Sequence, residues 1–196
     1  FGIYIKNPNT VAKNDDHYNS SPKLELMSIF EFNSNIPLIK KDDNYLNSLT
    51  PKFSFRINPS DMKDYSEGDR MINADNIFNI NRLSLDDTLE SGSSLTYGID
   101  FRKENLNNSQ KYVDFSLASI LRKKDENNIP KKTTLNKKNS NLFGSIDYNA
   151  SKFIKLEYDF SINNNFDSVD YNSVGLDLTV NNFVTTFEFL EENNEL

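Results

Sequence analysis

The chain has 196 residues and a formal net charge of −7, and only 36% of its residues are hydrophobic. An ordinary soluble globular domain carries more apolar residues, while 15 Phe and 9 Tyr argue against a disordered chain. The acidic balance disfavours nucleic acid as a partner, and the absence of Cys excludes disulfides and thiolate chemistry. No run of about 18 apolar residues occurs, so we expect no transmembrane helix.

Apolar and polar residues alternate along most of the chain. In the segment 154–162 every even-numbered residue is apolar and every odd-numbered residue is polar. Successive side chains of a strand point to opposite faces, so this pattern indicates a strand with one apolar and one polar surface. The same reasoning predicts nine strands: Gly2 to Lys6, Lys23 to Asn33 with a candidate extension to Lys40, Leu49 to Asn58, Ser94 to Lys103, Lys111 to Arg122, Leu142 to Asn149, Phe153 to Ile162, Tyr171 to Val180 and Phe183 to Leu190.

The connections between these strands alternate between short and long. Residues 149–152 and 181–182 are short links that begin with Asn, which tolerates the positive φ of hairpin turns, and 106–110 is also short. The polar links 58–93, 123–141 and 163–170 are much longer. Such alternation is typical of outer-membrane barrels, in which short turns face the periplasm and long loops face the exterior. Ten residues of a tilted strand span about 23 Å, which is close to the apolar band of such a barrel.

The sequence therefore predicts an all-β fold, an antiparallel up-and-down transmembrane β-barrel. We expect residues 1–196 to be a fragment of a single barrel domain, with about nine strands of a larger barrel, because the chain starts without Met inside a strand-like stretch. A soluble β-sandwich shows the same alternation with its apolar faces packed inward, and it is the alternative. Strands of ten to twelve residues favour the barrel, because soluble strands are usually shorter.

The predicted loop 58–93 carries the most specific motif of the chain, within residues 72–90. It resembles the LptD family of outer-membrane lipopolysaccharide-assembly proteins, whose loop reads Asn-Leu-Phe, two variable residues, then Asn-Arg-Phe-Ser-Gly-x-Asp-Arg. The matching residues are Asn76, Phe78, Asn81, Arg82, Ser84 and Asp87. Leu85 and Thr88 depart from the family's Gly and Arg. The resemblance extends from Leu49 onward, and residues 141–188 are similar to the hairpins of alphaproteobacterial members.

The resemblance implies a part of the translocon that inserts lipopolysaccharide into the outer leaflet of the Gram-negative cell outer membrane. It implies lipopolysaccharide, membrane lipid, an LptE-type plug lipoprotein and the periplasmic Lpt bridge as partners. The bridge would act through a jelly-roll domain that we expect to lie outside residues 1–196. The chain would supply barrel wall and lumen lining. The alternatives are another outer-membrane barrel, such as a porin or receptor, and a soluble β-sheet binding protein.

Two groups of candidate site residues follow. In the loop motif we expect Arg82 to hold Asp86 or Asp87 through paired hydrogen bonds, in a structural role that packs the loop over the barrel mouth. Polar strand positions would face the lumen, where they either pair with one another or guide a sugar-phosphate head group. These lumen-facing candidates are Arg56, Asp100, Arg102, Asp114, Lys155, Glu157, Asp159 and Asp177.

Three lysine pairs, at 123–124, 131–132 and 137–138, make the link 123–141 basic. Such a loop either contacts anionic lipid head groups or is an ordinary solvated surface loop. No Ser/His/Asp set, Gly-rich phosphate loop or metal-ligand spacing occurs. We therefore predict no enzyme, no catalytic residue, no metal site and no cofactor.

Overall fold

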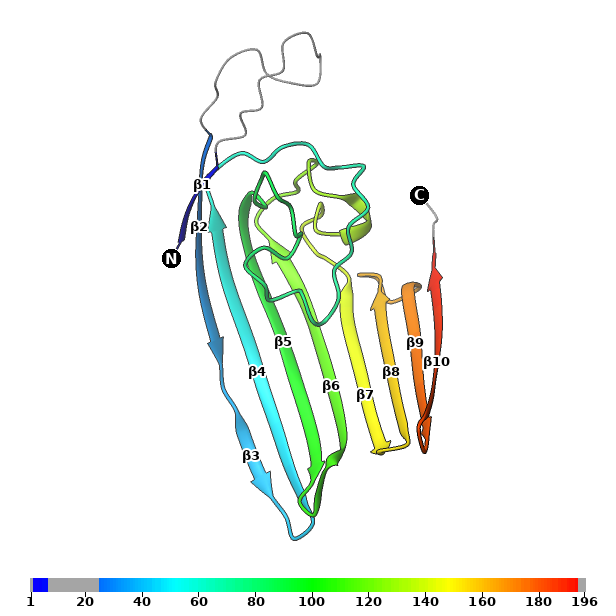
Figure 1. The fold of residues 1–196 in the computed structure, drawn as a ribbon. Coiled ribbons are helices and arrows are strands. Elements are labelled where there is room, and N and C mark those ends of the chain that lie inside the picture. Colours follow the sequence, from blue (N-terminus) through cyan, green and yellow to red (C-terminus); the bar gives the residue numbers. More distant parts are fainter. Residues whose placement is uncertain (1, 7–24, 194–196) are drawn as a thin grey trace.

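The computed structural model describes residues 2–6 and 25–193, which form one antiparallel sheet with a group of loops on one side (Figure 1). The strands are β1 (Gly2–Lys6), β2 (Glu25–Asn35), β3 (Leu38–Lys41), β4 (Tyr45–Asn58), β5 (Gly92–Asn105), β6 (Asn108–Arg122), β7 (Leu142–Ser151), β8 (Ile154–Ile162), β9 (Val169–Val180) and β10 (Phe183–Glu192). A single turn of 3-10 helix, Lys131–Thr133, interrupts the loops. The predicted all-β antiparallel fold is confirmed. Among the described residues, no helix is long and apolar enough to cross a membrane.

The sheet follows chain order, and β2 and β3 share one position beside β4. Residues 30–35 of β2 pair with 52–57 of β4, and residues 38–41 of β3 pair with 46–49. Pro37 lies in the break and Pro51 lies in the facing part of β4; neither has an N–H to donate to the ladder. The Ile36 N–H donates instead to the Pro51 carbonyl at 3.0 Å. The ten strands therefore fill nine positions, in agreement with the predicted number.

The short and long connections lie at opposite ends of the sheet (Figure 1). Short turns at 42–44, 106–107, 152–153 and 181–182 occupy one end. The long loops 59–91 and 123–141 and the link 163–168 occupy the other. Asn181 has φ of 55°, a left-handed conformation that Asn tolerates better than most residues. The alternation seen in the sequence thus separates a turn end from a loop end.

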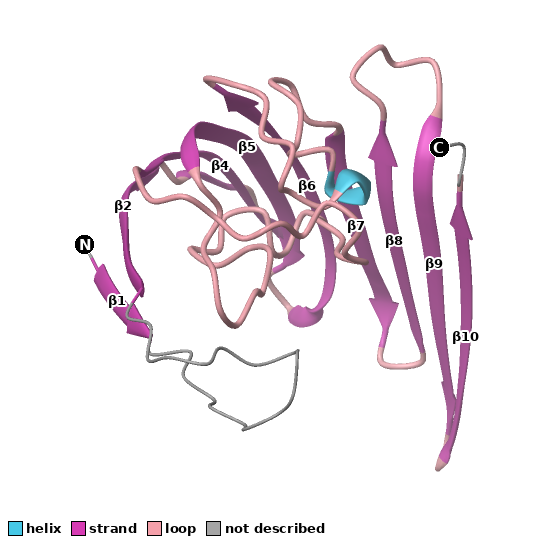
Figure 2. Ribbon diagram, turned by 90° about the horizontal axis from the view of Figure 1, so that it is seen from above, coloured by secondary structure: helices cyan, strands magenta, loops and turns pink. Residues whose placement is uncertain are grey.

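The two faces of the sheet differ in composition, and only one of them is covered by loops. The strand register places apolar side chains on one face, here called the outer face, as in the pairs Phe53–Tyr97, Phe55–Leu95 and Phe101–Phe115. Phe53 is 45% exposed and Phe55 47% exposed, and no described segment covers this face. The inner face is polar, and Figure 2 shows the sheet curving around the loops on that side. A soluble sandwich requires the opposite burial, so that alternative is wrong for the described strands.

The hydrophobic core lies between the loops and the inner face, toward the loop end. Ala118, Ile120 and Phe143 contribute from the strands. Buried loop side chains pack on them: Met62, Ile72, Ile77, Leu83, Leu85, Ile129 and Leu135. Residues 59–91 and 123–141 therefore form an inward-folded structure, the loop layer, whose burial of apolar side chains holds it against the sheet.

Gly98 on β5 allows this close approach. A Cβ at this position would lie 2.7 Å from the Leu117 carbonyl oxygen and 3.0 Å from the Phe78 ring. Phe78 packs against the core of the loop layer, so a side chain on Gly98 would push the loop layer off the inner face.

We predict that outer-face and inner-face substitutions differ sharply in full-length protein. Phe115→Arg or Leu156→Arg should impair assembly by about 2–4 kcal/mol near the membrane midplane, because a charge then faces hydrocarbon. Glu157→Gln, on the inner face, should be mild. The yield of folded protein in outer-membrane fractions checks this, and equal tolerance of the two kinds of change would contradict the assigned orientation.

Candidate functional site

The loop layer is attached to the sheet through one buried carboxylate, Glu90. Its side chain is only 2% exposed and lies just before β5 begins. Three arginines surround it: Arg82 from the loop layer, Arg56 from β4 and Arg122 from β6. These four residues, the Glu90 cluster, join the loop layer to two strands that are separated in the sheet by β5.

Arg82 makes the paired contact in the cluster. Its Nε and Nη2 donate to the two carboxylate oxygens of Glu90, each at 2.6 Å, in the paired geometry that suits a guanidinium and a carboxylate. The remaining donors reach β5, with Nη1 to the Thr96 hydroxyl at 2.9 Å and Nη2 to the Ser94 hydroxyl at 3.0 Å. Arg82 therefore binds the end of the loop and the adjacent strand at once.

Arg56 and Arg122 hold Glu90 from the two flanking strands. Arg56 donates to Glu90 at 3.1 Å through Nη1 and to Glu31 of β2 at 3.3 Å through Nη2. Its Nη2 also donates to the Asn79 carbonyl at 2.7 Å and to the Ile80 carbonyl. Arg122 donates to Glu90 and, at 2.6 Å, to the Ser91 carbonyl. Backbone carbonyls of the loop layer thus accept from Nη2 of Arg56 and Nη2 of Arg122, whereas the buried Nε of Arg122 has no partner among the described residues.

The electrostatics of Glu90 follow from this enclosure. Burial alone would raise the pKa of Glu90, but the charges of Arg82, Arg56 and Arg122 and the Arg82 hydrogen bonds outweigh it and lower the pKa to about 2. The carboxylate is therefore ionised throughout the physiological range. Breaking a buried ion pair of this kind leaves unpaired charge in the interior, which is costly.

The loop-motif residues build the turns that deliver Arg82 to Glu90. Asn76 and Asn73 exchange reciprocal side chain–backbone hydrogen bonds, both at 3.0 Å. Asn81 Nδ2 donates to the Leu85 carbonyl at 3.1 Å. Ser84 adopts a φ of 49°, so the left-handed residue of this turn is Ser84 itself. Leu85, which stands at the position of the family's Gly, consequently has its side chain in the core.

The carboxylate that Arg82 holds through paired hydrogen bonds is Glu90, not the expected Asp86 or Asp87. Asp87 instead accepts hydrogen bonds from Lys63 Nζ at 2.8 Å and from the Tyr65 hydroxyl. Thr88, which departs from the family's Arg, is buried and accepts the Lys63 N–H at 3.1 Å. The physical reason is depth: Arg82 is buried under the loop, whereas Asp87 lies in its partly exposed outer part.

All eight lumen-facing candidates lie on the inner face according to the strand register. Arg56 belongs to the Glu90 cluster. Several of the others pair with side chains on the same face: Asp100 with Lys52 at 2.5 Å, Arg102 with Asp114 at 2.6 Å, Lys155 with Glu157, and Asp177 with Thr186 at 2.7 Å. Asp159 is partly buried on β8. The structure therefore shows extensive mutual pairing along a polar wall.

The residues that the sequence reasoning missed are Glu90 and Arg122. Glu90 stands at the end of the motif segment without matching a family position, and Arg122 ends a predicted strand. The sequence does contain one indication of this site. Two predicted strands each carry an arginine, Arg56 or Arg122, on the polar side of the strand near its loop end. Two such cations, with Arg82 nearby, require a buried carboxylate, but alternation alone does not say which one.

The basic link 123–141 contacts the other long loop rather than standing apart from it. Lys131 pairs with Glu67 at 2.7 Å and Lys132 pairs with Asp69 at 2.8 Å. These exposed pairs add little stability, but they show that the two loops of the layer meet at their surfaces as well as in the core.

Comparison with known families places the chain in one of them. The family model described as LptD, LPS transport system D, matches residues 5–196. None of the curated proteins compared with the chain matches it.

We predict that Glu90→Gln releases the loop layer. Leaving three buried guanidinium groups without their carboxylate should cost about 3–5 kcal/mol. Protease cleavage of residues 59–91 and 123–141 in detergent-solubilised full-length protein measures the release. Glu67→Gln, which removes an exposed ion pair, is the matched control and should leave cleavage unchanged; equal protection of both variants would refute the assigned role of Glu90.

The attachment should also weaken in acid. The folded pKa of Glu90, about 2, lies below the ordinary value of 4.5, so its contribution is present above pH 4.5 and is lost as pH falls toward 2. The full loss is about 3 kcal/mol. Protease protection followed across this window in the wild type and in Glu90→Gln isolates the effect, because the variant lacks the titrating group. A parallel decline in both proteins would show that other carboxylates are responsible.

Proposed function

This chain belongs to the LptD family, and within that family's role in lipopolysaccharide transport to the outer membrane we propose a specific part for each of its two layers. The strands form barrel wall, with the outer face against membrane lipid and the inner face against an aqueous lumen. The loop layer closes the lumen at the loop end. A porin or receptor, which would serve diffusion or uptake, is not supported by the family match.

The observation that carries this proposal is that apolar side chains on the outer face are exposed, whereas charged side chains on the inner side are buried. Phe32, Phe53 and Phe55 are between 45% and 70% exposed, although the chain buries Arg56 and Glu90 almost completely. In water this arrangement is unfavourable, since apolar surface is left exposed while charge is desolvated. Against hydrocarbon it is favourable, because lipid covers the apolar face and the buried charges are paired.

The edges of the sheet support a larger barrel. Within the described residues, β1 and β10 each pair on one side only. Open edges within a membrane would leave backbone groups unsatisfied. Residues 1–196 are therefore proposed as one part of a single barrel domain, whose further strands pair with these edges.

The inner face below the loop layer is suited to a polar substrate. The lumen-facing residues pair with one another, as Arg102 does with Asp114, so the wall offers hydrogen bonds without a strongly attractive single site. Such a wall lets a saccharide pass without holding it. Lumen-facing Lys155 and Glu157 lie in the half of β8 nearer the turn end, whereas Asp159 lies in the half nearer the loop end.

The partners follow from this arrangement and from family membership. Lipopolysaccharide and components of the Lpt pathway are partners of the family. An LptE-type plug lipoprotein would occupy the lumen, and the periplasmic Lpt bridge would deliver lipopolysaccharide at the turn end through a jelly-roll domain. The location is the cell outer membrane of a Gram-negative bacterium, and the role is non-catalytic, with no cofactor.

The test is the permeability of the outer membrane in cells whose only copy of the full-length protein carries Glu90→Gln. We expect greater entry of a large hydrophilic antibiotic than in cells with Glu67→Gln, at equal levels of assembled protein, because the loop layer no longer closes the lumen. If the loops become protease-sensitive while permeability stays at the control level, the loop layer is not the closure.

A further inference from the structure

We propose that a pocket at the turn end of β4–β7, at the margin of the outer face, binds the phosphate of an anionic phospholipid. The inference rests on the proposed contact between the outer face and membrane lipid, and it adds a position and a lipid class to that contact. Three observations carry it: two lysines without a carboxylate, a border between apolar and polar side chains, and tyrosines at that border.

The pocket lies where β6 continues past the end of β7. Tyr112 and Asn149 form the last pair of these two strands toward the turn end, although β6 already begins at Asn108. Figure 1 shows the hairpin of β5 and β6 extending beyond the hairpin of β7 and β8. The pocket has a volume of about 370 Å³, and its lining comes from the turn ends of β4, β5, β6 and β7. It is therefore large enough for a lipid head group.

The pocket lies at the margin of the apolar part of the outer face. One row of the strand register across β4–β7 is entirely apolar: Leu49, Phe101, Phe115 and Ile146. The next row toward the turn end is mixed: Asn47, Lys103, Val113 and Tyr148. Tyr45 follows, with its ring centroid 4.4 Å from the Lys103 ammonium nitrogen. Tyrosines are enriched at membrane–water interfaces, so the border places the pocket at the depth of lipid head groups.

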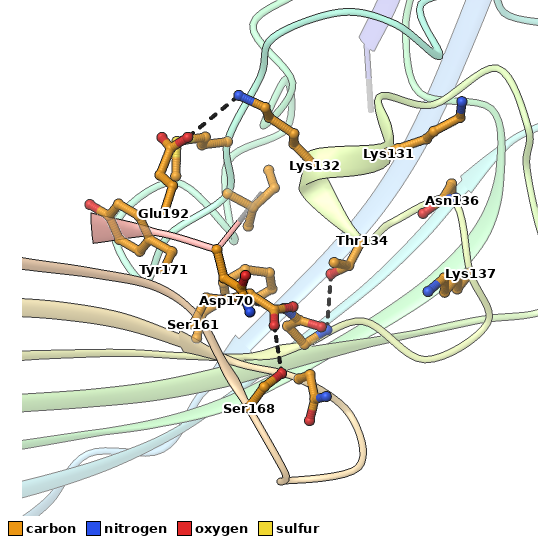
Figure 3. A pocket seen from close by; sticks show the side chains of 16 residues that line it. Lys131, Lys132, Thr134, Asn136, Lys137, Ser161, Ser168, Asp170, Tyr171 and Glu192 are labelled. Carbon is orange, nitrogen blue, oxygen red and sulfur yellow. Dashed lines mark hydrogen bonds and ion pairs between the residues drawn. The ribbon is translucent and has the colours of Figure 1, made fainter. Parts of the chain in front are cut away.

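The charge of the pocket is positive. Its lining contains Lys103 and Lys111 and no carboxylate, and neither lysine forms an ion pair with a described residue. The pocket at the loop end differs, because Asp170 and Glu192 lie among its lysines (Figure 3). Two cations without a compensating carboxylate favour an anionic ligand at the turn end.

Asn105 adds a neutral donor to the two lysines. Its Oδ1 accepts the Asn107 N–H at 2.9 Å and the Asn108 N–H at 3.1 Å, whereas its Nδ2 donates to no described residue. Two ammonium groups and an amide are donors that suit phosphate oxygens.

The surroundings of the pocket select among phosphate ligands. The apolar row next to it offers a surface on which acyl chains can lie, which a free phosphate would not use. A head group with its own ammonium would bring a third cation close to Lys103 and Lys111, which is unfavourable. The pocket therefore fits a phospholipid whose head group has a net negative charge, as in phosphatidylglycerol, in the membrane leaflet at the turn end.

Native mass spectrometry of the purified full-length protein in detergent measures the phospholipid that stays bound. Dioleoyl phosphatidylglycerol is the probe, and dioleoyl phosphatidylcholine, with the same chains and a neutral head group, is the comparison lipid. Lys103→Gln and Lys111→Gln should each weaken binding of phosphatidylglycerol about fivefold, as expected for the loss of one cation beside an anionic head group. Binding of phosphatidylcholine should change less than about twofold.

Lys152→Gln is the matched control. Lys152 lies in the turn between β7 and β8, at the same end of the sheet, with its ammonium 4.9 Å from the Phe153 ring centroid and outside the pocket lining. Its loss should weaken phosphatidylglycerol less than about twofold. Equal losses in all three variants would show diffuse attraction and overturn the site. Displacement of phosphatidylglycerol by inorganic phosphate at equal concentration would also overturn it, because a site for a bare anion needs no lipid.

The phospholipid site and the proposed barrel wall fail separately. If the protein retains both lipids equally and no variant changes either, the pocket does not select an anionic head group, but the outer face still contacts lipid. If the protein retains neither lipid, the assignment of the outer face to the membrane is wrong, and the phospholipid site is wrong with it.

Discussion

The structure depends on one buried carboxylate. Glu90 gathers Arg82 from the loop layer, Arg56 from β4 and Arg122 from β6, and each arginine also contacts another part of the chain. Desolvating these charges is costly, and only their mutual pairing and the backbone carbonyls around them offset that cost. The consequence is that a loop of more than 30 residues is fixed in one position on the inner face. Apolar contacts alone would define that position less strictly.

The same constraint explains how the chain combines a low apolar content with an ordered structure. Alternate residues of each strand face outward and remain exposed, and the core is built on the inner face from loop and strand side chains together. A wall of this kind has an apolar side for lipid and a polar side for water. The loop layer fills only the loop end, so the polar wall nearer the turn end stays open to a lumen.

Much of the fold was predictable from the sequence, whereas the centre of the site was not. Period-two alternation identified the strands, and the short polar links between them located the hairpin ends. β4 begins at Tyr45 rather than at Leu49, because pairing with β5 extends it through residues without clean alternation. The loop motif located Arg82, but its partner had to come from the structure. Asp87 belongs to the matched motif and Glu90 does not, yet burial and the convergence of two strands select Glu90.

The most direct test of this two-faced wall is spin-label accessibility along β5 in membrane-embedded full-length protein. Single Cys substitutions are made in residues 1–196, which contain no Cys, and any Cys elsewhere in the full-length protein is replaced. We expect labels at Leu95, Tyr97 and Ile99 to be accessible to oxygen dissolved in lipid. A label at Thr96, under the loop layer, should be protected from both oxygen and a water-soluble relaxant, and one at Asp100 should be accessible to the water-soluble relaxant. Equal accessibility at odd and even positions would contradict the assignment of lipid to one face and lumen to the other.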